Sequence, residues 1–389
     1  MPEQTDLRPA PRPALALAAG LLTMGVSLLA SWAILEAAIR VLGLAQPWVY
    51  RYDSAVGSHP RESIEFVWTK ENRAVVRLNS HGFHEREVPL KKPAGEVRVA
   101  VLGDSFVEAL QVAPEQSSTR LLEMLLRAQG HPAATVLAFG VSAFGTAQES
   151  LLLPEVMQYE PDLVLLYFTL VNDVRNNSFR LEAMRRRPFY RQKASGLELI
   201  PTPELSMLEK WSQPLEHSAA FRLLTERWTL IRRRLFEQGI ATAPPHDVDC
   251  DVFLEPPDAD WQDAWEVTGR VLAQMSASLA AKGVPFVVVV VPPWPLLYPE
   301  AWSEQLAREN FKPANAYDLG MPERRLAAIC GELSVPLVSP TEALVRESHR
   351  GSEPVCFAKI GHWTPAGHRV AAPAIAERLA ALGLPRRHR

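Results

Sequence analysis

The hydrophobic pattern of this chain changes near residue 45. Before that point lies one long apolar stretch, Pro13 to Leu35, which contains no charged residue. The 22 residues from Ala14 to Leu35 would form about 33 Å of helix at 1.5 Å per residue, enough to cross a hydrocarbon core of about 30 Å. The pattern predicts one transmembrane helix over residues 13–42.

After residue 95, short apolar runs alternate with segments of helical spacing. Each run is four to ten residues long and rich in Val, Leu, Ile or Phe, which is typical of a strand buried on both faces. The predicted strands are 97–103, 135–140, 162–171, 284–293 and 335–339, and the predicted helices are 118–130, 147–160, 261–281, 323–332 and 365–382. Alternation of this kind predicts a three-layer α/β/α fold with a central parallel sheet.

The two patterns divide the chain into four parts. We expect a cytoplasmic tail (1–12), a transmembrane anchor (13–42), an N-terminal extension (46–95) and a main domain (96–389) with an insertion at about 175–260. Arg8 and Arg12 precede the apolar stretch and Arg40 follows it, so the positive-inside rule favours a cytoplasmic N-terminus. The main domain would then lie outside the cytoplasm, held at the inner membrane by a single span. A cleaved secretory signal is the alternative.

The insertion contains a predicted hairpin with its turn at Ser195–Gly196, followed by a predicted helix. Apolar residues fall on one face of that helix: Phe221, Leu224, Trp228, Ile231 and Leu235. The stretch from Arg175 to Gly239 holds 13 Lys and Arg against 7 Glu. Such a surplus fits a surface that faces an anionic glycan or lipid headgroups. The simpler interpretation, which we prefer at this point, is a solvated helix whose apolar stripe packs on the core.

Composition excludes several classes of protein. The 389 residues are 47% hydrophobic and 22% charged, as in ordinary globular proteins. A net charge of −3 argues against a nucleic-acid binder. Three cysteines are too few for a disulfide scaffold, although one pair, Cys330–Cys356, is as plausible as none. His81 and His84 lack further ligands at suitable spacing, so no metal site is expected.

Three polar positions stand where chemistry is expected in such a fold. Ser105 follows the first apolar strand in Gly-Asp-Ser, and Asn172 follows the third. Both therefore belong to the carboxyl edge of the sheet, where α/β proteins bind ligands. His362 opens the last predicted helix in GHWTPAGH, and imidazole is the commonest general base near neutral pH.

The order of these segments resembles the SGNH (GDSL-like) hydrolase superfamily, in particular its membrane-anchored bacterial members. The similar segments are VLGDSF (101–106), VND (171–173) and HWTPAGH (362–368), with NSHGF (79–83) and FGVSAFGTAQ (139–148) beside them. The resemblance implies that Ser105 is the nucleophile and His362 its base. It further implies an oxyanion hole made by the N–H groups of Ser105 and Ala143 and the side chain of Asn172, and no cofactor.

Two departures from the family pattern matter. Ala143 stands where the family usually has glycine; alanine keeps the N–H unless the position requires φ > 0. Lys359 and Ile360 stand where the family usually has the triad aspartate. Either a backbone carbonyl orients His362, or a carboxylate from elsewhere, such as Glu353, replaces the aspartate, or catalysis is lost. We expect the first, a Ser105–His362 dyad, with Asp104 in a structural role.

The predicted function is therefore hydrolysis of small acyl esters, most simply O-acetyl groups on an envelope polysaccharide, through an acyl-Ser105 intermediate. The expected partners are an acylated carbohydrate or another small ester, and the membrane, without nucleic acid. An O-acyltransferase would use the same residues. A degenerate, non-catalytic envelope protein that binds glycan or a partner is the alternative from another class.

Overall fold

The computed structural model describes residues 13–45, 47–194, 196–237, 248–308, 316–358 and 361–385. They form two compact units. The smaller comprises Met1–Trp48 and Leu205–Pro244, and the larger comprises Val49–Glu204 and Pro245–Arg389. The predicted tail (1–12) and the residues Lys359, Ile360 and Ser195 lie outside the described residues.

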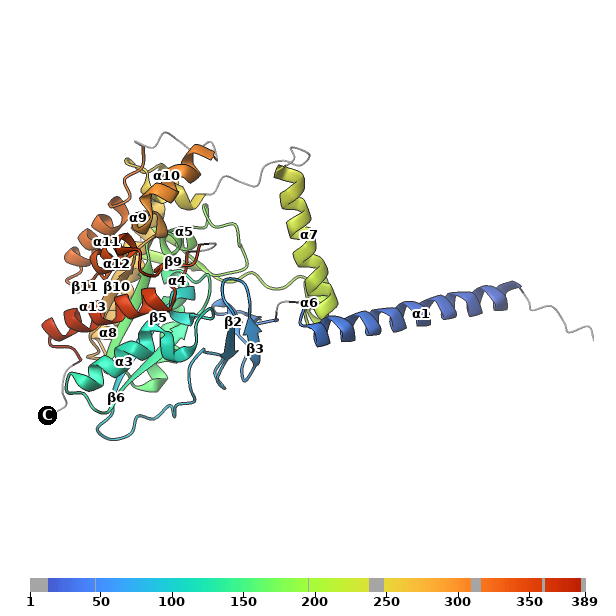
Figure 1. Cartoon of the computed structure of the whole chain (residues 1–389), viewed down its shortest axis with the longest axis horizontal. Coiled ribbons are helices and arrows are strands. Elements are labelled where there is room, and N and C mark those ends of the chain that lie inside the picture. Colours follow the sequence, from blue (N-terminus) through green and yellow to red (C-terminus); the bar gives the residue numbers. More distant parts are fainter. Residues whose placement is uncertain are drawn as a thin grey trace, which may run out of the picture. The chain divides into compact units, whose positions relative to one another are not determined.

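The smaller unit consists of helices α1 (Pro13–Leu42), α6 (Met207–Glu216) and α7 (Ala219–Glu237) (Figure 1). Between Leu15 and Leu42, α1 is long and apolar enough to cross a membrane, and its apolar window has no residue buried within the protein. The predicted N-terminal apolar helix is therefore present. Its length and composition fit a membrane span or a signal sequence equally.

The larger unit is built on a five-stranded parallel sheet. Its strands are β5 (Val97–Gly103), β6 (Ala134–Gly140), β7 (Leu163–Thr169), β10 (Phe286–Val291) and β11 (Leu337–Val338). They pair in the order β11-β10-β7-β5-β6. The predicted α/β fold with a central parallel sheet is confirmed, and the five strands lie where the apolar runs predicted them.

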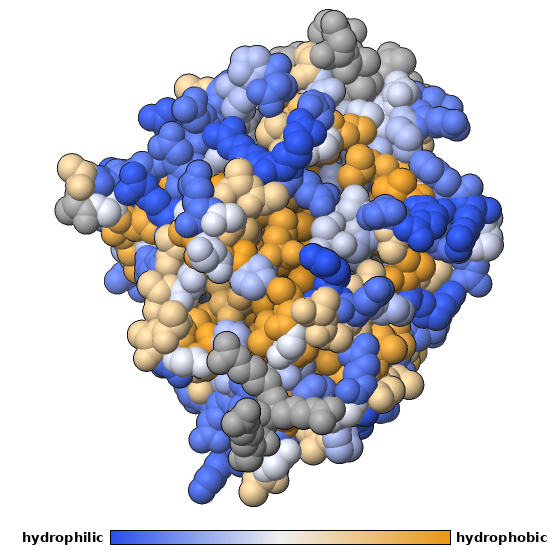
Figure 2. Space-filling view, turned by 90° about the vertical axis from the view of Figure 1, so that its left-hand side faces the viewer, coloured by the Kyte–Doolittle hydropathy of each residue, from blue (hydrophilic) through white to orange (hydrophobic). Residues whose placement is uncertain are grey.

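Helices cover both faces of this sheet, because successive side chains of a strand point to opposite faces. Along β5, Val99 and Val101 contact one core cluster, while Ala100 and Leu102 belong to the other. The first face is covered by α3 (Ser118–Ala128), α12 (Thr341–Arg350) and α13 (Pro365–Ala381); the second by α4 (Thr146–Val156), α8 (Ala259–Ala280) and α11 (Met321–Glu332). The outer surface on the side of α11 and α13 mixes hydrophilic and hydrophobic residues (Figure 2).

The strand order creates a crevice at one point of the carboxyl edge. Numbered along the chain within the sheet, the strands run 2-1-3-4-5, so the chain turns to the opposite direction between β5 and β7. In doubly wound sheets, ligands bind outside the carboxyl ends of the strands at such a switch point. Ser105 follows β5 and Asn172 follows β7. The two residues therefore lie on adjacent strands at the expected binding edge.

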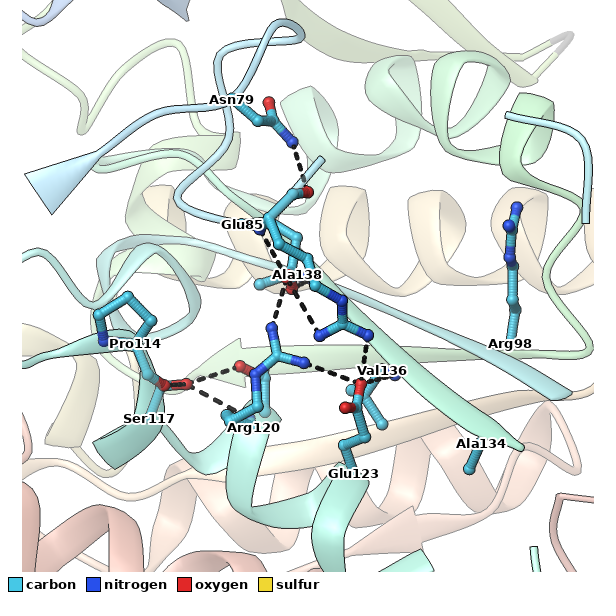
Figure 3. Close-up of polar contacts among 12 residues, drawn as sticks. Asn79, Glu85, Arg98, Pro114, Ser117, Arg120, Glu123, Ala134, Val136 and Ala138 are labelled. Atoms are coloured by element: carbon cyan, nitrogen blue, oxygen red, sulfur yellow. Dashed lines mark hydrogen bonds and ion pairs between the residues drawn. The ribbon is translucent and has the colours of Figure 1, made fainter. Parts of the chain in front are cut away.

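The segment before the sheet folds into two antiparallel hairpins: β1 (Tyr50–Asp53) with β2 (Gly57–Pro60), and β3 (Glu65–Trp68) with β4 (Ala74–Arg77). Further on, buried ion pairs tie this segment to α3 and to the edge strand β6 (Figure 3). Glu85 and Glu123 contact Arg120 at 2.5 and 2.8 Å, and they accept the N–H groups of Ala138 and Val136. The unpaired edge of β6 is thereby closed.

The insertion differs from its prediction in one respect. The hairpin is present as β8 (Phe189–Lys193) and β9 (Gly196–Ile200), and α7 covers the predicted helix. However, Leu224, Trp228 and Ile231 on the apolar stripe are 47–60% exposed. The interpretation of a stripe packed on the core is wrong, because in its own unit only the first turns of α7 contact a neighbour.

Candidate active site

Ser105 begins a short helix, α2 (Ser105–Glu108), immediately after β5. Asp104 caps this helix: its buried carboxylate accepts the N–H of Phe106 at 3.0 Å. The neighbouring strand end must come very close, since a Cβ on Gly140 would lie 2.0 Å from the amide nitrogen of Glu108. The serine is thus presented at the sheet edge by a turn with little freedom, and the predicted structural role of Asp104 matches its contacts.

His362 meets Ser105 across 257 residues of sequence. Its Nε2 lies 2.7 Å from Ser105 Oγ, a hydrogen-bond distance. The neighbouring Trp363 is fully buried, and Thr364 caps α13 through the N–H of Gly367. Phe106 packs edge-on against the His362 ring at 5.2 Å between centroids. The helix start and the buried tryptophan together hold the imidazole beside the serine.

The third group of this constellation is Glu71. Its Oε2 lies 2.5 Å from His362 Nδ1, and its side chain is completely buried. The expected dyad with a backbone carbonyl is therefore wrong: a carboxylate occupies the position that the missing aspartate would take. Glu353, the candidate proposed from sequence, is 61% exposed and instead pairs with Arg369.

Glu71 comes from the N-terminal extension, in the connection between β3 and β4. The adjacent Asn72 donates to the backbone carbonyl of Gln111 at 3.1 Å, which fixes the connection against the segment after α2. Glu71 is 291 positions from its histidine, within an unremarkable Lys-Glu-Asn sequence. No sequence signal distinguished it from other acidic residues, so only the fold identifies it.

Asn172 lies at the start of α5 (Asn172–Asn177), next to the nucleophile's turn. Its Nδ2 donates to Asp104 Oδ2 at 2.6 Å, so the carboxylate before Ser105 orients the amide. Because an amide nitrogen carries two hydrogens, one N–H remains for another acceptor. Burial raises the pKa of Asp104 to about 6.

Ala143 adopts the conformation that glycine normally supplies. Its φ is +64°, in the left-handed region, at a cost of about 1–2 kcal/mol for a residue with a Cβ. Its carbonyl accepts hydrogen bonds from Asn176 Nδ2 at 3.0 Å and Arg187 Nη1 at 2.8 Å. Glu108 holds the preceding residue by accepting the Ser142 N–H at 3.0 Å. The loop is thus fixed from both sides, and alanine retains the N–H that the predicted oxyanion hole needs.

Several other polar residues singled out by sequence have structural contacts. His368 accepts the Ser118 N–H through Nδ1 at 3.0 Å, and burial lowers its pKa to about 3, so the ring is neutral. His84 Nδ1 lies 2.8 Å from the carbonyl of Glu108, and His81 packs on Tyr159. All three cysteines are buried, and no disulfide joins Cys330 to Cys356.

Carboxyl groups lie buried behind the catalytic edge. Glu149 and Asp173 are both inaccessible to solvent, and the two oxygens of Glu149 have no hydrogen-bond partner among the described residues. Burial, together with the nearby Asp104, raises the pKa of Glu149 well above its ordinary 4.5. Asp173 accepts the N–H of Thr169 at 3.0 Å, and its pKa is also raised.

A cavity of about 640 Å3 opens beside these residues. Asn172, Phe106 and Gly361 form part of its wall, so it adjoins the Ser105–His362 pair. None of the described residues in the wall is charged, and aromatic rings dominate: Phe106, Phe253, Trp294, Tyr298, Trp302 and Phe357. Such a cavity suits an uncharged group with apolar faces.

Comparison with known proteins gives one family match. Residues 251–388, about a third of the chain, match a family described as "SGNH hydrolase-like domain, acetyltransferase AlgX". The match includes His362 and ends the chain; Ser105 and Asn172 precede it. No curated protein matches the sequence.

Solved structures of similar outline include three esterases or lipases. The crystal structure of TesA is 14% identical, with 73% of this chain and 99% of that one covered and a TM-score of 0.38. An acetyl xylan esterase, AlAXEase, is 11% identical (73% and 100% covered, TM-score 0.40). A GDSL-like lipase from Bacteroides thetaiotaomicron is 13% identical (76% and 93% covered, TM-score 0.36). Similarity at this level carries no weight for function.

Proposed function

Because the chain belongs to the SGNH hydrolase superfamily, we propose that it is a serine enzyme that cleaves small acyl esters, with Ser105, His362 and Glu71 as its triad. The observation that carries the proposal is the continuous hydrogen-bonded series Ser105 Oγ–His362 Nε2, His362 Nδ1–Glu71 Oε2. A nucleophile, a base and a group that orients the base is the arrangement needed for acyl transfer through a covalent intermediate.

In this mechanism Glu71 accepts Nδ1–H of His362, which leaves Nε2 free to accept the Ser105 proton. The serine oxygen attacks the acyl carbonyl and displaces the alcohol, which takes that proton from His362. Water then releases the acyl group by the same steps in reverse roles. The N–H groups of Ser105 and Ala143 and the side chain of Asn172 are proposed to stabilise the oxyanion, a contribution of about 10²–10³ in rate for each donor.

The proposed substrate is a neutral acyl ester, most simply an O-acetyl group on an envelope polysaccharide. The absence of charged side chains from the described wall of the cavity favours an uncharged sugar over a uronate. Its tryptophans offer flat apolar surfaces of the kind on which sugar rings pack. Helix α1 would anchor the protein in the inner membrane with this domain outside the cytoplasm.

Transfer of the acyl group to a sugar hydroxyl is the second candidate. The description of the matching family as an acetyltransferase favours it. Both reactions share the acyl-Ser105 intermediate and differ only in whether water or a sugar hydroxyl attacks it. Mass spectrometry of a neutral oligosaccharide incubated with the enzyme and an acetyl donor separates them: transfer adds an acetyl group to the sugar, whereas hydrolysis yields acetate alone.

Labelling with a fluorophosphonate probe tests the nucleophile. We expect the full-length protein to react and to release p-nitrophenol from p-nitrophenyl acetate, and Ser105→Ala to do neither. Ser303→Ala, which removes an exposed hydroxyl on α10 (Pro299–Arg308), is the matched control and should behave as wild type. Equal labelling of wild type and Ser105→Ala would favour the non-catalytic, glycan-binding or partner-binding alternative.

A further inference from the structure

The smaller unit exposes large apolar side chains on two consecutive helices. Seven of them are between 45% and 79% exposed: Met207, Leu208, Trp211 and Leu215 on α6, and Leu224, Trp228 and Ile231 on α7. Soluble proteins seldom leave such a set uncovered, and exposed apolar patches commonly mark contact with a membrane or another protein.

The exposed apolar residues follow helical spacing. Leu208, Trp211 and Leu215 are three and four residues apart, so they share one face of α6. On α7, the same spacing joins Leu224, Trp228 and Ile231. Charged residues such as Glu209 and Glu226 fall on other faces. Each helix is therefore amphipathic, with its apolar face unburied.

Hydrogen bonds attach the start of α7 to the end of α1. The Glu36 carboxylate accepts the N–H groups of Ala219 and Ala220 at 2.8 and 2.9 Å, and Arg40 donates to the carbonyl of His217 at 2.6 Å. Glu36 is the first charged residue after the uncharged stretch from Pro13 to Leu35. The start of α7 is thus fixed at the level where the apolar span ends.

Helix α7 runs across the end of α1 and does not extend its axis (Figure 1). If α1 crosses a bilayer, a helix crossing its end follows the membrane surface, where the interfacial layer is about 5–8 Å thick on each side. Tryptophan is enriched in that layer because its ring is apolar and its N–H is polar. Trp211 and Trp228 are respectively 77% and 60% exposed on the two apolar faces.

We propose that α6 and α7 form a membrane-surface element whose apolar faces enter the interfacial layer of the bilayer that holds α1. The inference rests on the membrane anchor of the proposed function. A helix of this kind buries its apolar face about 5–10 Å into the boundary between headgroups and acyl chains. The element would hold the enzyme's smaller unit flat on the membrane, beyond what a single span achieves.

The test places an environment-sensitive fluorophore, NBD, on single introduced cysteines in the full-length protein. Trp228→Cys and Leu208→Cys report on the apolar faces, and Glu226→Cys, on the opposite face of α7, is the matched control. Leu29→Cys, in the middle of α1, reports on the anchor. The unsubstituted protein is the labelling blank, since its three cysteines are buried. Each protein is reconstituted in vesicles of phosphatidylethanolamine and phosphatidylglycerol, with or without nitroxide-labelled lipid.

We expect lipid nitroxide to quench NBD at positions 29, 208 and 228, and aqueous iodide to quench it at 226 only. If position 29 is quenched by lipid while 208 and 228 respond to iodide, the surface element is refuted and the anchor stands. Protection of 208 and 228 from both quenchers would refute it too, in favour of a protein partner or a second copy. Failure of position 29 to reach lipid would overturn the anchor, and with it the element.

Discussion

Two groups of buried carboxyls in the larger unit have opposite surroundings. At the edge of the sheet, Glu123 contacts Arg86, Arg120 and Arg127 at 2.8–3.0 Å and also accepts the N–H of Val136. Behind the catalytic edge, Glu149 is just as inaccessible, yet neither of its oxygens has a hydrogen-bond partner among the described residues. The residue type and the burial are the same, and only the partners differ.

The difference separates what the fold needs from what the site tolerates. A buried carboxylate that is fully paired locks segments together, whereas one without partners is disfavoured in its charged form. Glu71 belongs to the paired kind, but its partner is His362. Removing charge should therefore impair activity at Glu71, impair stability at Glu123 and improve stability at Glu149.

The largest expected effect is that of Glu71→Gln on turnover. A neutral amide does not stabilise the imidazolium that forms when His362 takes the serine proton, so kcat should fall by about 10⁴-fold. Steady-state hydrolysis of p-nitrophenyl acetate measures this fall. Glu353→Gln removes the exposed carboxylate that sequence analysis had suggested and should leave kcat unchanged. If Glu353→Gln lowers kcat and Glu71→Gln does not, the triad is wrongly assigned.

Glu123→Gln should produce the next largest effect, on stability. Breaking a buried ion-pair network costs about 3–5 kcal/mol, because the arginines are left without their counter-charge. Thermal or urea unfolding of the detergent-solubilised protein measures it. Glu342→Gln, which breaks the exposed 2.8 Å pair with Arg346, is the control and should cost at most about 1 kcal/mol. Equal losses from the two substitutions would show that burial does not set the difference.

The smallest effect, and the opposite in sign, is expected for Glu149→Gln. Since the pKa of Glu149 is raised in the folded protein, the folded state binds its proton more tightly than the unfolded state. Stability from this group is therefore full below about pH 4.5 and declines as the pH rises above that value. Glu149→Gln should have the wild-type melting temperature at pH 4 and a higher one at pH 8.

Exposed Glu377 on α13 is the control for that measurement, and Glu377→Gln should follow the wild-type pH dependence throughout. A melting temperature of Glu149→Gln below that of wild type at pH 8 would mean that Glu149 has a stabilising partner in its charged form. The contrast between the two carboxyl groups would then disappear.

The sequence by itself determined the elements and the edge at which chemistry is expected. Strands buried on both faces read as short apolar runs, since local hydrophobicity reflects burial. For the same reason α1 was visible as an uncharged stretch. Ser105, Asn172 and His362 were found because each follows or precedes an element directly, so the position of each along its strand or helix is a local property.

Only the tertiary structure decided the strand order, the acid and the surroundings of α7. The switch point between β5 and β7 depends on which strands pair, and pairing joins residues far apart in the chain. Glu71 reaches His362 across 291 positions, through a hairpin fixed by Asn72, and nothing in its neighbours records that approach. Likewise, an apolar stripe at helical spacing predicts a buried face, but not whether protein or lipid covers it, because both exclude water equally.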